Sequence, residues 1–153
     1  ALNQLGGHMM PEAELSNIKN ASIVISFFGK WPSFHDAEVV KIELDRLGPD
    51  ALIQIYVFET LKETDERGYY KQIKHSIITF KLLELESLEL WDFNTQNVLT
   101  DFRVESNGQE IKVELVSCYG VGGNITCHGI EVISIEPALV TQGKRGPARK
   151  ISG

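Results

Sequence analysis

Apolar and polar residues alternate along most of the chain, and this alternation predicts strands. Val40, Ile42 and Leu44 alternate with charged residues, which is typical of a strand with one buried face. Similar or wholly apolar runs recur between turn-forming sequences. The predicted strands lie in residues 40–44, 52–58, 69–80, 82–90, 98–105, 111–118 and 125–135. This pattern favours a mostly β (α+β) domain, in which an antiparallel sheet is folded as a sandwich or an open barrel.

Turn-forming residues set the expected limits of these strands. Asn107-Gly108 is a strong hairpin dipeptide and is expected to join the strands on either side of it. Residues 62–68 are polar and predict a loop, and Ser87 is expected to interrupt a longer strand. Pro137 is expected to end the last strand, because proline cannot donate a hydrogen bond to a neighbouring strand.

A short helix is expected near the start of the chain. Residues 11–19 predict an amphipathic helix, because Leu15 and Ile18 are three positions apart and Pro11 stands near its first turn. Residues 23–28 are apolar except for one serine. Their periodicity does not decide whether they continue this helix or form a buried strand.

The two ends of the chain differ in composition from the body. Residues 1–9 end in Gly-Gly-His-Met and are expected to be an expression-tag remnant, with the native start at Met9 or Met10. Residues 141–153 are basic and rich in glycine, and predict a flexible tail that is either vector-derived or native. The length of 153 residues then fits a single β-rich domain within residues 10–140.

Charge is unevenly distributed along the chain. There are 15 Lys and Arg residues against 21 Asp and Glu residues, and the tail holds four of the basic residues and none of the acidic ones. The body is therefore strongly acidic, which argues against binding to nucleic acid. Such acidity suits a basic protein partner, and it is equally consistent with a role in solubility alone. A membrane protein is not expected, because the longest uncharged apolar run covers only residues 21–29.

Neither the cysteines nor the glycine-rich turn predicts a cofactor site. Cys118 and Cys127 lack the closely spaced cysteine pair of a zinc site, so both are expected to be free core cysteines. Residues 120–123 are rich in glycine, but a further strand follows where a phosphate-binding loop requires a helix. A hairpin turn is therefore favoured, and no cofactor or metal is expected.

One short segment before the first predicted strand combines aromatic, histidine and carboxylate side chains. His35, Asp36 and Glu38 are candidates for acid–base chemistry or for a metal cluster. In an extended chain, however, Asp36 and Glu38 would share one face and His35 would lie on the other. The favoured interpretation is structural. Asp36 would accept backbone N–H groups where the loop meets the strand, while Trp31 and Phe34 anchor the loop.

Two blocks of the sequence resemble a known family. Residues 28–39, followed by residues 42–46, resemble the opening signature of the Immunity protein 50 family. Residues 78–80 and 90–99 resemble later blocks, so that the resemblance spans residues 16–137. The matched positions are Trp31, Phe34, His35, Asp36, Glu38, Asn94 and Asn97.

This resemblance implies a cytoplasmic immunity protein of a bacterial polymorphic toxin system, which binds and neutralises a cognate toxin domain. It implies no catalytic residues. The toxin domain is expected to be basic, since an acidic protein would recognise it by charge complementarity. The acidic residues considered for contact with it are Glu84, Glu86, Glu89, Asp65 and Glu66.

A second class of function stays open on the sequence alone. His35, Asp36 and Glu38 would serve a small metal-binding or hydrolytic β domain if their side chains converged in one pocket. A binding protein would instead hold these side chains apart, or bury them as structural groups. The arrangement of these three residues therefore distinguishes the two classes.

Overall fold

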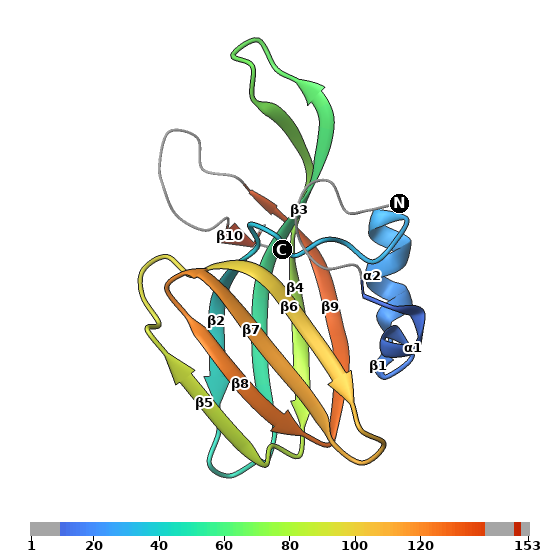
Figure 1. The fold of residues 1–153 in the computed structure, drawn as a ribbon, viewed down its shortest axis with the longest axis vertical. Helices are drawn as coiled ribbons and strands as arrows, with labels where there is room; N and C mark the ends of the chain where they lie inside the picture. Colours follow the sequence, from blue (N-terminus) through green and yellow to red (C-terminus); the bar gives the residue numbers. More distant parts are fainter. Residues whose placement is uncertain (1–9, 140–148, 151–153) are drawn as a thin grey trace.

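The computed structural model describes residues 10–139 and 149–150, which form two short helices and one sheet (Figure 1). The helices are α1 (Glu12–Leu15) and α2 (Ala21–Phe28). The strands are β1 (Ile18–Lys19), β2 (Glu38–Leu44), β3 (Ala51–Thr64), β4 (Tyr70–Leu83), β5 (Ser87–Trp91), β6 (Val98–Ser106), β7 (Ile111–Tyr119), β8 (Gly122–Cys127), β9 (Gly129–Leu139) and β10 (Arg149–Lys150). The expected tag remnant at residues 1–9 lies outside the described residues, as does the expected tail apart from β10.

The strands follow one another in a single open sheet. Their order is β1-β9-β4-β3-β2-β6-β7-β8-β5, and β10 also pairs with β9. The sheet is mixed, because β1 runs parallel to β9 while the other pairs are antiparallel. The prediction of a mostly β domain with a short N-terminal helix is confirmed. The expected sandwich or open barrel is not found among the described strands, since β1 and β5 end the same sheet without pairing with each other.

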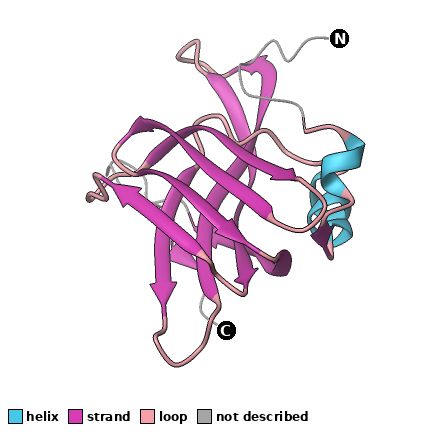
Figure 2. Ribbon diagram, turned by 60° about the horizontal axis from the view of Figure 1, so that its bottom comes forward, coloured by secondary structure: helices cyan, strands magenta, loops and turns pink. Residues whose placement is uncertain are grey.

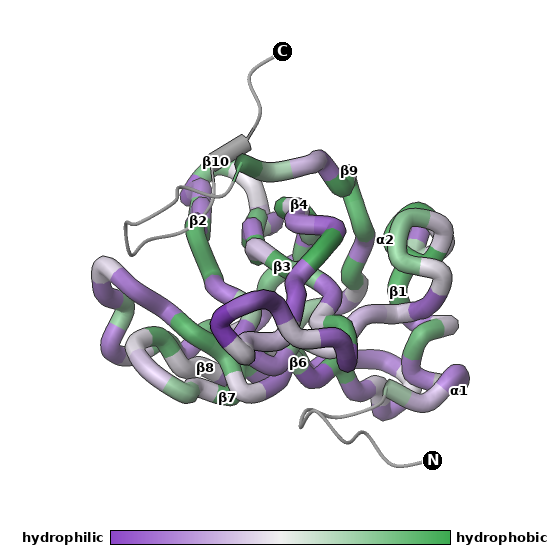
Figure 3. The backbone as a smooth tube through the Cα atoms, turned by 90° about the horizontal axis from the view of Figure 1, so that it is seen from above, coloured by the Kyte–Doolittle hydropathy of each residue, from purple (hydrophilic) through white to green (hydrophobic). Residues whose placement is uncertain are grey.

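The sheet folds over on itself at the junction of β2 and β6. These two strands share one register pair, Glu38 with Val98. Figures 1 and 3 show the β6-β7-β8-β5 half lying across the β2-β3-β4-β9 half. The ring of Phe80 on β4 lies 5.0 Å from the ring of Phe102 on β6, although β3 and β2 separate these strands within the sheet. The apolar core therefore fills the space between the two halves.

Helix α2 lies beside β9 at the side of the sheet (Figures 1 and 2). Ala21, Val24 and Phe28 are buried, with the three- and four-residue spacing of an amphipathic helix. Gly29 ends the helix in the left-handed conformation, at φ 84°. Residues 23–28 are therefore helical. No helix in the described part of the chain is long and apolar enough to cross a bilayer.

The helix predicted over residues 11–19 is only partly present. Helix α1 covers Glu12–Leu15, and Ile18 then enters the sheet in β1, where it pairs with Ile130 of β9. Ile18 is 3% exposed. The apolar residue that suggested a longer helical face is thus buried by strand pairing, a long-range contact that local periodicity does not indicate.

Strand β3 extends past its predicted end at residue 58 and forms, with the start of β4, a two-stranded arm, residues 61–71, that projects from the body (Figure 1). The loop predicted over residues 62–68 is therefore too long, because β3 continues to Thr64. Both faces of the arm are largely exposed to solvent. Its residues consequently do not alternate in polarity, and the pattern that reveals a half-buried strand is missing there.

Other expected strand limits have mixed outcomes. The hairpin at Asn107-Gly108 and an interruption next to Ser87 are confirmed. Pro137 does not end its strand, because β9 continues to Leu139. Neither β1 nor β10 pairs with Pro137, because β1 pairs with Ile130 and Glu131 and β10 with Ala138 and Leu139. This leaves room for a residue that has no N–H group.

Candidate functional site

Trp31 and Phe34 belong to the core between the two halves of the sheet. Phe34 is 2% exposed. Its ring centroid lies 5.1 Å from that of Phe102 and 6.3 Å from that of Phe80. The Trp31 ring packs against Phe34 at 5.8 Å and against Phe80 at 6.2 Å. Because Phe80 and Phe102 come from facing halves, these two motif residues anchor the segment by closing the core.

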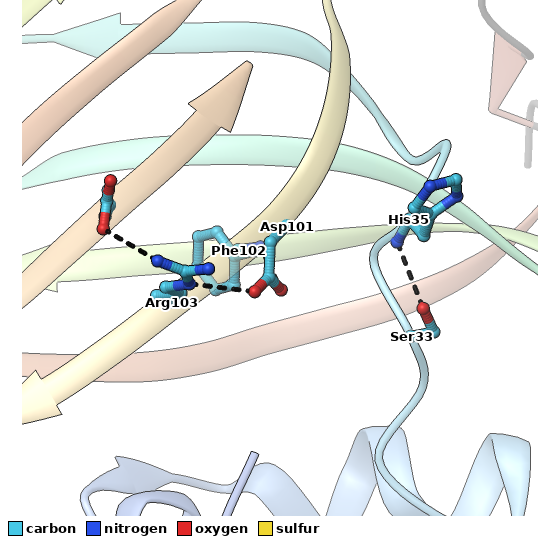
Figure 4. Close-up of polar contacts among 6 residues, drawn as sticks. Ser33, His35, Asp101, Phe102 and Arg103 are labelled. Atoms are coloured by element: carbon cyan, nitrogen blue, oxygen red, sulfur yellow. Dashed lines mark hydrogen bonds and ion pairs between the residues drawn. The ribbon is translucent and has the colours of Figure 1, made fainter. Parts of the chain in front are cut away.

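His35 and Asp36 lie in a turn at the edge of the core. Asp36 adopts the left-handed conformation, at φ 68°, and its backbone N–H donates to the Leu99 carbonyl oxygen at 2.9 Å. The His35 N–H donates to Ser33 Oγ at 3.2 Å (Figure 4), and His35 Nδ1 lies 3.3 Å from Asp36 Oδ2. The strand-like alternation considered for this segment is therefore wrong. The backbone of Asp36 makes the junction, while its carboxylate lies against His35.

Glu38 does not join His35 and Asp36, because it lies on β2 beside Tyr56 of the neighbouring strand. It is 8% exposed on β2 and lies directly opposite Tyr56 of β3. Burial raises the pKa of the Glu38 carboxyl, and a hydrogen bond from the Asn97 backbone partly offsets this rise. The hydroxyl of Tyr56 hydrogen-bonds to Nδ1 of His75 at 2.5 Å. Glu38 thus belongs to a buried cluster with Tyr56 and not to a site with His35 and Asp36.

The loop that holds His35 and Asp36 also lines a cavity of about 280 Å³ at the base of the arm. Its walls combine aromatic side chains, including Trp31 and Phe58, with the carboxylates of Asp36 and Glu59. Glu59 is paired with Lys74 at 3.6 Å. Within the described residues, no group of three or more His, Cys, Asp or Glu side chains is placed to hold a metal ion. The cavity therefore holds the His35–Asp36 pair without Glu38, and its described residues include no cluster that could hold a metal ion.

Asn97 ties two loops of the chain together. Its Oδ1 accepts hydrogen bonds from the N–H groups of Asn94 and Val121, at 2.8 and 3.0 Å. Its Nδ2 donates to the Asn94 carbonyl oxygen at 2.8 Å, and Asn97 is 3% exposed. Gly120 packs so closely that an added Cβ would lie 2.3 Å from the Gln96 carbonyl oxygen. The loop between β5 and β6 is therefore fastened to the turn between β7 and β8.

A buried carboxylate that the sequence did not single out lies on β6. Asp101 is 3% exposed. Its two oxygens accept hydrogen bonds from the Phe102 N–H at 2.8 Å and from Arg103 Nε at 3.0 Å (Figure 4). Arg103 also approaches Glu114 on β7, at 3.7 Å. These contacts satisfy the carboxylate and join neighbouring strands, which is a structural role.

The acidic candidates fall into two groups at opposite ends of the molecule. Asp65 and Glu66 are exposed at the tip of the arm, while Glu84, Glu86 and Glu89 are exposed on β5 and on the turn before it. Strand β4 runs from one group to the other (Figure 1). At about 3.3 Å per residue, this strand separates them by roughly 40 Å. The two groups therefore do not form one compact surface.

The two groups also differ in net charge. Residues 82–97 contain four acidic residues and no Lys or Arg, whereas the arm contains three of each sign. We call Glu84, Glu86, Glu89 and Asp92 the acidic edge. Glu86 lies 3.2 Å from His128 Nε2. Hydrogen bonds to the side chains of Glu110 and His128 hold the pKa of Glu86 below its usual value, and Glu86 in turn raises the pKa of His128.

Three exposed aromatic side chains that were not among the candidates from the sequence adjoin the acidic edge. Trp91, Phe93 and Tyr119, here called the aromatic patch, are 44%, 54% and 55% exposed. Trp91 pairs with Gly122 across β5 and β8, and Tyr119 pairs with Val98. In β5 the exposed residues alternate with the half-buried Leu88 and Leu90. That alternation is the signal that would have placed Trp91 on the outer face, beside Glu89.

The two cysteines have different environments. Both are free, and Cys127 is buried as expected, whereas Cys118 is exposed. Burial raises the pKa of the Cys127 thiol to about 11. The core prediction is wrong for Cys118, because β7 runs past the core beyond Leu115 and its last residues are largely exposed.

Comparison with protein families gives one match. The family model described as Immunity protein 50 matches residues 20–138. This range runs from the residue before α2 into the end of β9, and it contains the motif segment, the acidic edge and the aromatic patch. Neither the search of curated proteins nor the search of solved structures gave a match.

Proposed function

The chain belongs to the Immunity protein 50 family, and on this premise we propose that it is a cytoplasmic protein of a bacterial polymorphic toxin system that binds the cognate toxin domain through its acidic edge. Membership of an immunity family implies neutralisation of a cognate toxin. The family match over residues 20–138 is the observation that carries this proposal. The acidic edge, the toxin's basic character and the cytoplasmic location are parts of the proposal.

Charge favours the acidic edge over the arm as the toxin-facing surface. The edge has four carboxylates on a stretch without Lys or Arg, so its local field is negative. In the arm, the carboxylate of Asp65 accepts hydrogen bonds from the backbone N–H groups of Arg67 and Tyr69, which is a turn-forming role. An interface of standard size covers about 800 Å² on each partner. One such interface would therefore centre on one end of the molecule and not on both.

Inhibition of a toxin by covering its substrate site fits this chain better than a catalytic function does. A toxin domain with a basic site for a nucleic acid or nucleotide would be covered by a negatively charged surface, which would exclude its substrate. Members of immunity families are typically non-catalytic inhibitors. The alternative of a metal-binding or hydrolytic site at His35, Asp36 and Glu38 is not favoured, because Glu38 pairs with Tyr56 and does not line the cavity that His35 and Asp36 share.

The test is binding to the toxin domain encoded beside the gene of this protein. The purified proteins are mixed and analysed by calorimetry, and toxicity is measured in cells with and without the immunity protein. A tight one-to-one complex, together with loss of toxicity, is the expected result. Absence of binding and of protection would overturn the proposal. Protection without a complex would reject neutralisation by direct binding.

A further inference from the structure

Exposed aromatic residues are unevenly distributed over the surface. Trp91 and Phe93 are neighbours in sequence, at the end of β5 and in the loop after it, whereas Tyr119 comes from the end of β7. Trp91 pairs with Gly122, which follows Tyr119 by three residues, so the end of β5 lies beside the turn that follows Tyr119. Large apolar groups gathered in this way on a surface mark interaction sites more often than single exposed residues do.

The patch is held rigidly by the chain beneath it. Asn97 joins the loop that carries Phe93 to the turn that follows Tyr119, through hydrogen bonds with Asn94 and Val121. The indole of Trp91 lies against Gly122, where an added Cβ would be 2.4 Å from Nε1. Side chains presented by a rigid backbone lose little conformational freedom on binding, which favours affinity.

Charge identifies the kind of surface that would cover the patch. Glu89 shares the outer face of β5 with Trp91, and Asp92 lies between Trp91 and Phe93 in the sequence. A complementary surface would therefore present an apolar depression surrounded by Lys or Arg side chains. Interfaces commonly combine central aromatic anchors with charged residues at the rim. The patch and the acidic edge have this arrangement.

We propose that Trp91, Phe93 and Tyr119 are the anchoring residues for the toxin, and that they insert into an apolar depression rimmed by basic residues on its surface. This inference rests on the proposed function. The aromatic anchors set the lifetime of the complex, because their burial must be undone on dissociation, whereas the surrounding carboxylates act mainly on the encounter rate.

The experiment compares two double variants, each of which removes two exposed aromatic side chains, one pair in the patch and one pair in the arm. Phe93→Ala with Tyr119→Ala removes two anchors, and Tyr69→Ala with Tyr70→Ala removes two tyrosines of the arm that are 68% and 56% exposed. Dissociation from the immobilised toxin domain encoded by the neighbouring gene is measured by surface plasmon resonance. The patch variant is expected to dissociate roughly 10- to 100-fold faster, and the arm variant at the wild-type rate.

The outcomes separate this inference from the proposed function. A wild-type protein that does not bind the toxin domain would refute both. A wild-type protein that binds, with a patch variant that dissociates at the same rate, would refute the anchoring role alone. Equal melting temperatures of the two variants exclude unfolding as the cause of any loss. If the wild type alone sediments as a dimer that the patch variant abolishes, the patch serves a second copy of this chain, and the proposal is overturned.

Discussion

Glu38 on β2 lies directly opposite Tyr56 on β3, and both residues are buried. Burial, and to a smaller extent the negative charge of Glu38, raises the pKa of Tyr56 to about 12. The aromatic ring of His75 stacks on that of Tyr56, with centroids 5.8 Å apart, and burial lowers the pKa of His75. A residue of the family motif thus sits in an ionisable cluster within the sheet, where its charge state affects folding.

Replacing Glu38 with Gln is expected to make stability less dependent on pH. Because burial raises the pKa of this carboxyl in the folded state, its contribution is fully present below the unfolded value of 4.5 and is lost as pH rises through the folded value. Gln retains an oxygen for the Asn97 N–H and carries no charge. Urea unfolding at about pH 4 and about pH 8 measures the difference.

The wild type should lose more stability than Glu38→Gln between these two pH values, and the variant should be at least as stable at the higher one. A variant that is destabilised at about pH 8 by more than about 1 kcal/mol would show that the carboxylate makes a favourable contact there. That outcome would contradict burial as the dominant influence on Glu38.

Phe34 is expected to matter for folding and not for toxin contact. Phe34→Ala removes a ring that touches both halves of the sheet, and should lower the free energy of unfolding by about 3–5 kcal/mol. Tyr69→Ala, at an exposed position on the arm, should change it by no more than about 0.5 kcal/mol. Denaturant unfolding of both variants gives these values. A stable Phe34→Ala variant that no longer binds toxin would place this residue in the interface.

Local sequence signals predicted the elements whose residues alternate regularly or form a standard turn. The strand beginning near Val40 and the hairpin at Asn107-Gly108 are of this kind. The extension of β3 into the arm was missed because a two-stranded ribbon buries neither face. The aromatic patch depends on Trp91 meeting Gly122 across two strands. Such long-range pairings are set by the register of the sheet, which a single sequence does not reveal.

Gly120 is expected to be much less tolerant of substitution than Gly108. Both have positive φ, at 79° and 98°, so alanine is strained at either position by about 1–2 kcal/mol. Only at Gly120 would the added Cβ also meet other atoms, at 2.3 Å from the Gln96 carbonyl oxygen and 2.8 Å from Asn97 Oδ1. The thermal unfolding of Gly120→Ala and Gly108→Ala isolates this clash. Equal melting temperatures would contradict this expectation, because they would show that the turn shifts to accommodate the Cβ while the hydrogen bonds of Asn97 are kept.

Reversing the charge of the acidic edge is expected to slow association with the toxin. With Glu84, Glu86 and Glu89 all changed to Lys, the association rate should fall roughly 10- to 100-fold at low salt and much less at high salt, because exposed charges steer encounter and salt screens them. Glu63, Asp65 and Glu66 in the arm, all changed to Lys, form the matched control with the same number of reversed charges, which should leave the rate nearly unchanged. Stopped-flow mixing with the toxin domain at two salt concentrations gives both rates. An edge variant with the wild-type rate and salt dependence would exclude the edge as the steering surface, and a slower arm variant would assign that role to the other end of the molecule.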